Sequence, residues 1–97
     1  MIDKWQANAL MDVYGGLLTN RQQEILSLYF EEDFSYFEIS ESLNISRAAV
    51  LDAVHKAVKQ LEKYEEKIGY LKKKKQISSI CDMYAESVVS AKIKDIL

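Results

Sequence analysis

The fold is decided by residues 35–57, which read SYFEISESLNISRAAVLDAVHKA. The segment opens with a capping box, a serine followed three residues later by a glutamate, which predicts a short helix over residues 36–43. Asn44 tolerates the left-handed backbone of a tight turn, and Ser46 can cap a new helix. A short helix, a turn of about three residues and a second helix together predict a helix-turn-helix.

Two more helices are expected before this motif. Apolar residues recur at roughly helical spacing over residues 2–17, and a glycine pair then offers a stop. Thr19 and Gln22 form another capping box, which predicts that the next helix starts at Asn20. The acidic residues 31–33 are expected to end that helix.

The helix after the turn has no obvious stop before Gly69. Its apolar or small residues are spaced alternately by four and three positions, which is a heptad stripe. Because the stripe extends beyond the helix-turn-helix, either the last helix or a second chain must cover it. The stripe consists of Val50, Val54, Ala57, Leu61, Tyr64, Ile68 and Leu71.

A final amphipathic helix is expected from Ile77 to about Ile96. The sequence therefore predicts an all-α fold of five helices, with a long fourth helix and a C-terminal helix packing on it. Composition favours the same class, because 48% of the 97 residues are hydrophobic and proline is absent.

The length predicts a single domain over residues 1–97. Within it, residues 18–61 would form the helix-turn-helix, and residues 62–97 a long-helix extension with the C-terminal helix. A chain this short has little core to spare, so the extension favours a homodimer. The expected interface residues are Leu61, Tyr64, Ile68 and Leu71.

Charge is unevenly distributed along the chain. Residues 1–66 hold 6 Lys/Arg and 12 Asp/Glu, whereas residues 67–97 hold 7 Lys/Arg and 3 Asp/Glu. The part that carries the helix-turn-helix is therefore acidic, which disfavours non-specific attraction to phosphates. The basic run Lys72, Lys73, Lys74 and Lys75 could bind RNA, DNA or an anionic membrane surface. Alternatively, it is a solvated turn that complements the end of the long helix.

Other function classes find little support. Cys81 is the only cysteine, so neither an intrachain disulfide nor a thiolate metal cluster is expected, and a cytoplasmic setting is natural. The chain shows no signal peptide and no apolar run of about 18 residues, so no membrane span is expected. Without a phosphate loop, a nucleophile elbow or a ligand cluster, we expect no enzyme, metal, cofactor or small-molecule substrate.

Residues 18–61, LTNRQQEILSLYFEEDFSYFEISESLNISRAAVLDAVHKAVKQL, resemble the DNA-binding region 4 of bacterial sigma factors. The shared pattern is LT-x-R-Q, S-Y-x-E-I-A, L-x-I-S-R and a final apolar-H-R/K-A, and the resemblance implies a helix that enters the major groove. In this sequence Leu51 and Asp52 stand where the family commonly has arginines or glutamines, and Asp52 would face a polyanion. The candidate nucleic-acid-binding residues are Ser46, Arg47, Ala48, Leu51, Asp52, His55, Lys56 and Lys59.

A second resemblance runs the full length. The start MIDKWQANALMDVYGGLLTNRQQEILSLYFEEDFSYFEIS, the helix-turn-helix and the long helix are similar to the YlxM family of small bacterial proteins. That resemblance implies a regulatory or accessory role in the signal recognition particle pathway. Two hypotheses follow: a dimeric DNA-binding regulator, or an interaction module that keeps the fold and docks onto signal recognition particle protein or RNA.

Overall fold

The computed structural model describes residues 2–97 and divides the chain into two compact units, Met1–Lys67 and Ile68–Leu97. Every secondary-structure element of the described residues is helical, so the predicted all-α class is confirmed. That the two units act as one domain stays a prediction. Each unit is described by itself below.

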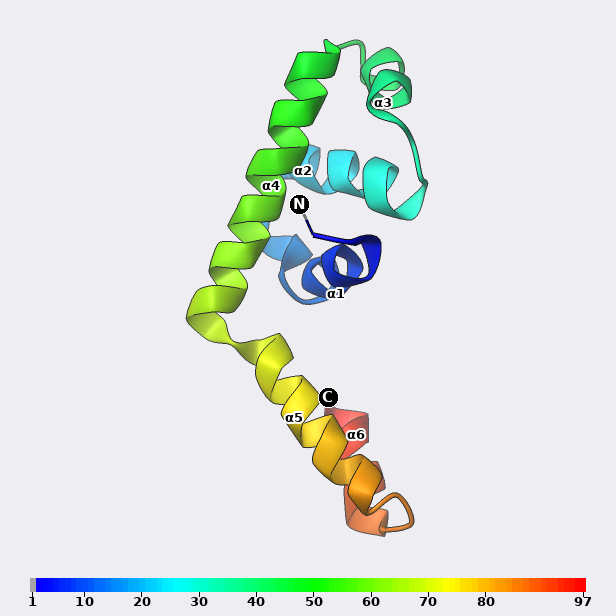
Figure 1. Cartoon of the computed structure of the whole chain (residues 1–97), viewed down its shortest axis with the longest axis vertical. Helices are drawn as coiled ribbons and strands as arrows, with labels where there is room; N and C mark the ends of the chain where they lie inside the picture. Colours follow the sequence, from blue (N-terminus) through cyan, green and yellow to red (C-terminus); the bar gives the residue numbers. More distant parts are fainter. Residues whose placement is uncertain (1) are drawn as a thin grey trace. The chain divides into compact units, whose positions relative to one another are not determined.

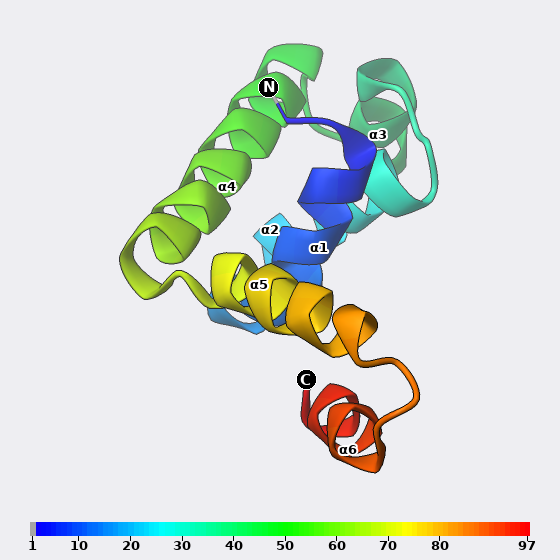
Figure 2. The same cartoon turned by 60° about the horizontal axis from the view of Figure 1, so that its bottom comes forward.

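The first unit is built around one long helix, α4, and the shorter helices α1, α2 and α3 lie on the same side of it (Figures 1 and 2). Its elements are α1 (Lys4–Tyr14), the 3₁₀ turn η1 (Gly15–Leu17), α2 (Asn20–Leu26), the π-helical turn η2 (Ser27–Glu31), α3 (Tyr36–Leu43) and α4 (Arg47–Ile68).

The local signals place most helix ends correctly. Thr19 and Gln22 form the predicted capping box, and α2 starts at Asn20. The serine–glutamate capping box before α3 is also present, and α3 covers residues 36–43 as predicted. The second half of the predicted second helix differs, because the chain widens there into the π-helical turn η2.

The heptad stripe of α4 is covered by the helices that precede it. Val50, Val54, Ala57 and Leu61 are 0% exposed. The helices α1 and α2, which lie beside α4, carry buried side chains of their own, among them Leu10 and Leu26. Leu61 was predicted at a dimer interface, and that assignment is wrong for this residue, since its side chain is already enclosed within one chain.

Polar contacts fasten α1 to its neighbours. The hydroxyl of Tyr14 donates to the Glu65 carboxylate of α4 at 2.6 Å, and the Tyr14 and Tyr64 rings lie 6.0 Å apart. At the other end of α1, the Lys4 ammonium pairs at 3.0 Å with Asp33, two residues after η2. These contacts join both ends of α1 to the elements that hold the helix-turn-helix.

An aromatic pair joins η2 to the start of α3. The Tyr29 and Tyr36 rings stack 4.9 Å apart with an interplanar angle of 10°. Burial and the neighbouring Tyr29 hydroxyl raise the pKa of Tyr36 to about 12. The stack therefore fixes the first helix of the helix-turn-helix onto the π-helical turn.

The second unit is a helical hairpin of α5 (Tyr70–Met83) and α6 (Val88–Ile96), which lie side by side (Figure 2). The prediction of one final helix is therefore wrong, and the described residues form six α-helices. Folding back lets α6 pack on α5, which buries Cys81 and Ser90, while Lys94 pairs with Asp82 across the two helices. One continuous helix would leave these faces without a neighbour.

Candidate nucleic-acid interface

The turn between α3 and α4 has the geometry that the sequence predicts. Asn44 adopts the left-handed conformation with φ 55°, and the Ile45 amide donates to the Ser40 carbonyl at 3.1 Å. The Ser46 hydroxyl oxygen then accepts from the amide of Ala49 at 3.0 Å, which caps the start of α4. The second helix of the motif therefore starts with one of its otherwise unpaired backbone amides satisfied.

Packing across the turn sets the two helices against each other. Ile39 of α3 and Val50 of α4 are both 0% exposed. Ser40 is also buried, and its hydroxyl donates to the Phe37 carbonyl at 2.7 Å, so this small polar residue costs the core no unsatisfied group. The outward face of α4 is thereby held on a rigid support.

All the candidate nucleic-acid-binding residues are exposed. They occupy the cap and the first half of α4, and none of them contributes to the core of the first unit. Their contact with nucleic acid stays a prediction. The residues are Ser46, Arg47, Ala48, Leu51, Asp52, His55, Lys56 and Lys59.

Three charged side chains of this face have partners within the chain. The Lys56 ammonium pairs with the Asp52 carboxylate at 2.9 Å, one turn apart on α4. The Arg47 guanidinium lies 4.8 Å above the centre of the Phe37 ring of α3. Asp52 therefore faces solvent as part of an ion pair, which reduces the repulsion that a lone carboxylate would exert on phosphates.

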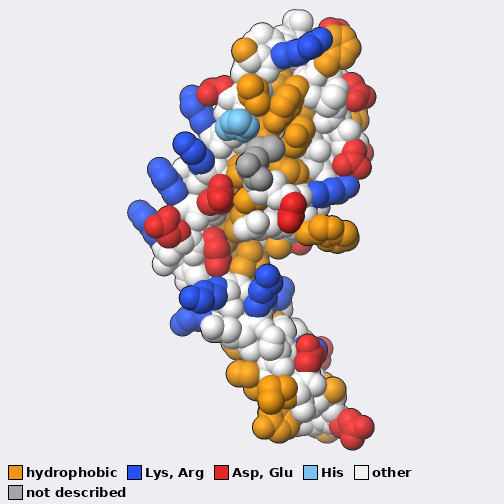
Figure 3. Space-filling view, viewed as in Figure 1, with side chains coloured by type: hydrophobic (Ala, Val, Ile, Leu, Met, Phe, Trp, Pro, Cys, Tyr) orange, Lys and Arg blue, Asp and Glu red, His pale blue; other side chains and the backbone are white. Residues whose placement is uncertain are grey.

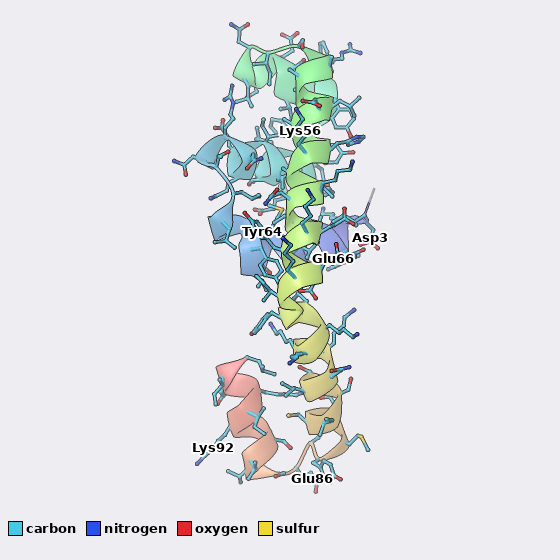
Figure 4. All side chains as sticks on the ribbon, turned by 90° about the vertical axis from the view of Figure 1, so that its left-hand side faces the viewer. Asp3, Lys56, Tyr64, Glu66, Glu86 and Lys92 are labelled. Carbon is cyan, nitrogen blue, oxygen red and sulfur yellow. The ribbon has the colours of Figure 1, made fainter. Side chains whose placement is uncertain are left out.

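The exposed lysines of α4 form a longer row than the sequence assignment contained. Lys56, Lys59, Lys63 and Lys67 recur about once per turn on the side of α4 opposite the core. Figure 3 shows basic side chains along the outer edge of α4, and Figure 4 turns that edge toward the viewer, with Lys56 and Glu66 labelled. We call these four residues the lysine row.

Lys63 and Lys67 were missed, although the sequence carries a signal for them. The heptad stripe fixes which side of the helix is buried, and both lysines fall on the opposite side. The residues predicted from sequence ended with the helix-turn-helix, whereas α4 continues to Ile68 and carries the whole row.

His55 and Lys59 border an open groove between the start of α1 and α4, with a volume of about 680 Å³. The groove has mixed polar and apolar walls. Across residues 2–97, no group of three or more His, Cys, Asp or Glu side chains is placed to hold a metal ion. The remaining lining residues are Ile2, Asp3, Gln6, Val58 and Glu62.

The remaining predicted site residues lie at the end of α4 and on α5. Lys72, Lys73 and Lys75 are exposed and Lys74 is half-buried, all within the first turns of α5. Of the other predicted interface residues, Ile68 is 55% exposed, whereas Tyr64 and Leu71 are half-buried. Among the described helices, none combines the length and apolarity that crossing a bilayer requires.

Comparison with known proteins gives a consistent result. The model of one family, described as "Putative helix-turn-helix protein, YlxM / p13 like", matches residues 1–96. A UPF0122 protein of Caldanaerobacter subterraneus is 44% identical over 79 residues, which are 81% of this chain and 68% of the relative. A UPF0122 protein of Halalkalibacterium halodurans is 42% identical over 91% of this chain and 82% of its own length. A UPF0122 protein of Ureaplasma parvum is 37% identical over 96% of this chain and 94% of its own length. The chain therefore belongs to the UPF0122 family of YlxM/p13-like helix-turn-helix proteins.

Proposed function

We propose that this protein is a regulatory protein that binds duplex DNA through the outward face of α4. The observation that carries the proposal is the joint exposure of the helix-turn-helix face and the lysine row on one helix. In this arrangement the first turns of α4 enter a major groove, while the lysines behind them approach phosphates. Membership of a helix-turn-helix family supports it.

The charge pattern is compatible with DNA despite the acidic first unit. Most of its carboxylates lie on elements other than α4, and Asp52 is compensated by Lys56. Glu62 and Glu66 do flank the lysine row, so the expected affinity is modest and depends strongly on salt.

Arg47→Ala is expected to weaken binding to duplex DNA by about 1–3 kcal/mol, because the guanidinium stands at the tip of α4, where a base edge or phosphate is nearest. Lys56→Gln should mainly reduce the salt dependence of binding. Fluorescence anisotropy of labelled duplex DNA and labelled signal recognition particle RNA, at low and near-physiological salt, measures both effects.

The matched control is Arg21→Ala, which removes an exposed arginine from α2 and should leave affinity unchanged. Equal affinity of the wild-type and Arg47 variants would remove this surface from the proposal. Binding to RNA alone, or to neither nucleic acid, would redirect the search to protein partners.

We also propose that the protein acts as a homodimer, which would present two copies of α4 to two half-sites. Ile68 is the predicted interface residue with the largest exposed fraction, 55%, and Tyr64 and Leu71 complete the predicted set. Sedimentation equilibrium over a range of concentrations measures the self-association directly.

A second candidate function is docking onto signal recognition particle protein or RNA. The difference in charge between the two units favours it. Residues 1–67 hold 7 Lys/Arg and 12 Asp/Glu, whereas residues 68–97 hold 6 Lys/Arg and 3 Asp/Glu. The basic charge of the second unit is concentrated in residues 72–75, on a helix separate from the lysine row.

For this second candidate, replacing all of Lys72–Lys75 with glutamine is expected to abolish association with the particle, since the run supplies most of the positive charge of its unit. Co-sedimentation with purified particle RNA and protein is the measurement. Undiminished association would contradict this function and leave the DNA proposal untouched.

A further inference from the structure

The first turns of α4 present unusual chemistry for a surface that reads bases. Ala48, Leu51, Asp52 and His55 share one side of the helix, spaced three or four residues apart. Leu51 is 41% exposed although it is a large apolar side chain. The exposed side chains Ala48 and Leu51 are therefore neighbours on the surface, one turn from each other.

Three of the charged groups around them already have partners within the chain. Asp52 holds Lys56 at 2.9 Å, and Arg47 lies on the Phe37 ring at 4.8 Å. No asparagine, glutamine or second arginine follows in the first three turns of α4, so side chains that pair with adenine or guanine in a bidentate manner are scarce here. Between Arg47 at the tip of α4 and the lysines behind it, this face offers the floor of a groove His55 and the two apolar side chains Ala48 and Leu51.

Only one apolar group is displayed by base pairs in the major groove, the C5-methyl of thymine. Other base edges present hydrogen-bonding groups, which would lose water against Leu51 without gaining a partner. The flanking cations of the lysine row fit the phosphates on either side of such a contact.

We propose that Ala48 and Leu51 contact thymine methyl groups, so that the protein prefers duplexes with thymines in the major groove facing α4. This inference rests on the proposed duplex-DNA function and adds the base class that the site selects. Specificity then comes from apolar contact, with affinity supplied by the lysine row.

The test compares a short alternating d(AT) duplex with the same duplex in which deoxyuridine replaces thymidine. This substitution removes only the C5-methyl and keeps base pairing. Loss of contact with two methyl groups is expected to weaken binding by about 10- to 15-fold. In Leu51→Ala the ratio between the two duplexes should fall to about fourfold, the value for one remaining methyl contact.

Leu17→Ala is the matched control, because Leu17 is an equally apolar residue, 59% exposed on the turn after α1. It should keep the wild-type ratio, and circular dichroism checks that both variants fold. Equal binding of the two duplexes by the wild-type protein would overturn the methyl contact while the DNA function stands. An unchanged ratio in Leu51→Ala would overturn the assignment to Leu51, and absence of binding to either duplex would overturn both proposals.

Discussion

Leu61→Ala is expected to lower the free energy of unfolding of the first unit by about 3–5 kcal/mol. The leucine side chain is 0% exposed, so its removal leaves a cavity between α4 and the helices that cover it. A domain of this size has a total stability of about 5–15 kcal/mol, and the variant would therefore be close to unfolding. Urea denaturation followed by far-UV circular dichroism gives the value.

The control is Ile68→Ala, which truncates another apolar residue of the heptad stripe. Ile68 is 55% exposed, and the free energy of unfolding should change by no more than about 0.5 kcal/mol unless a second copy covers it. Sedimentation equilibrium separates the two roles, because a dimer contact at Ile68 weakens association. If Leu61→Ala instead kept its stability and lost only association, Leu61 would lie between chains and the packing described for α4 would be wrong.

Local sequence signals predicted the helix-turn-helix well. The side chains that decide its boundaries act on backbone groups no more than three residues away. Thr19 and Ser35 bond to the backbone of the helices they start, and Asn44 occupies the one left-handed position of the turn. Such signals depend on nothing distant in the chain, so the sequence alone is sufficient to place them.

Signals that depend on a packing partner were harder to interpret. The stripe that begins at Val50 predicts a buried face but does not identify the elements that cover it. In the structure α1, α2 and α3 all lie on that side of α4. Likewise, the periodicity from Ile77 to Ile96 is compatible with one helix or with a hairpin. Only the contact that buries Cys81 against α6 distinguishes the two.

The sequence predicted the positions of the candidate site residues, but it did not predict the side-chain contacts that depend on other elements. The eight candidate residues between positions 46 and 59 follow from the helix-turn-helix pattern and all of them are exposed, while their contact with nucleic acid stays a prediction. The ion pair of Asp52 with Lys56 and the stacking of Arg47 on Phe37 depend on side-chain conformation and on α3, which the pattern does not specify. These contacts change the chemistry that α4 offers to a ligand.

Replacing Lys56, Lys59, Lys63 and Lys67 together with glutamine is expected to remove most of the affinity for duplex DNA. If each lysine neutralises one phosphate, the slope of log K against log salt concentration should fall by about 3–4. At low salt the affinity should then fall by a factor of about 10²–10³. Glutamine keeps the length and the helix preference of the side chains, so α4 itself should persist. Anisotropy titrations at several salt concentrations give the slope.

The same four substitutions at residues 72–75 provide the matched control, since they remove equal charge from α5. If duplex DNA binds along α4, only the first set lowers the slope. Similar losses from both sets would mean that the total charge, and not the helix-turn-helix face, attracts the nucleic acid. A loss from the second set alone would place the nucleic-acid contact on the C-terminal hairpin, which is the arrangement that the signal recognition particle hypothesis requires.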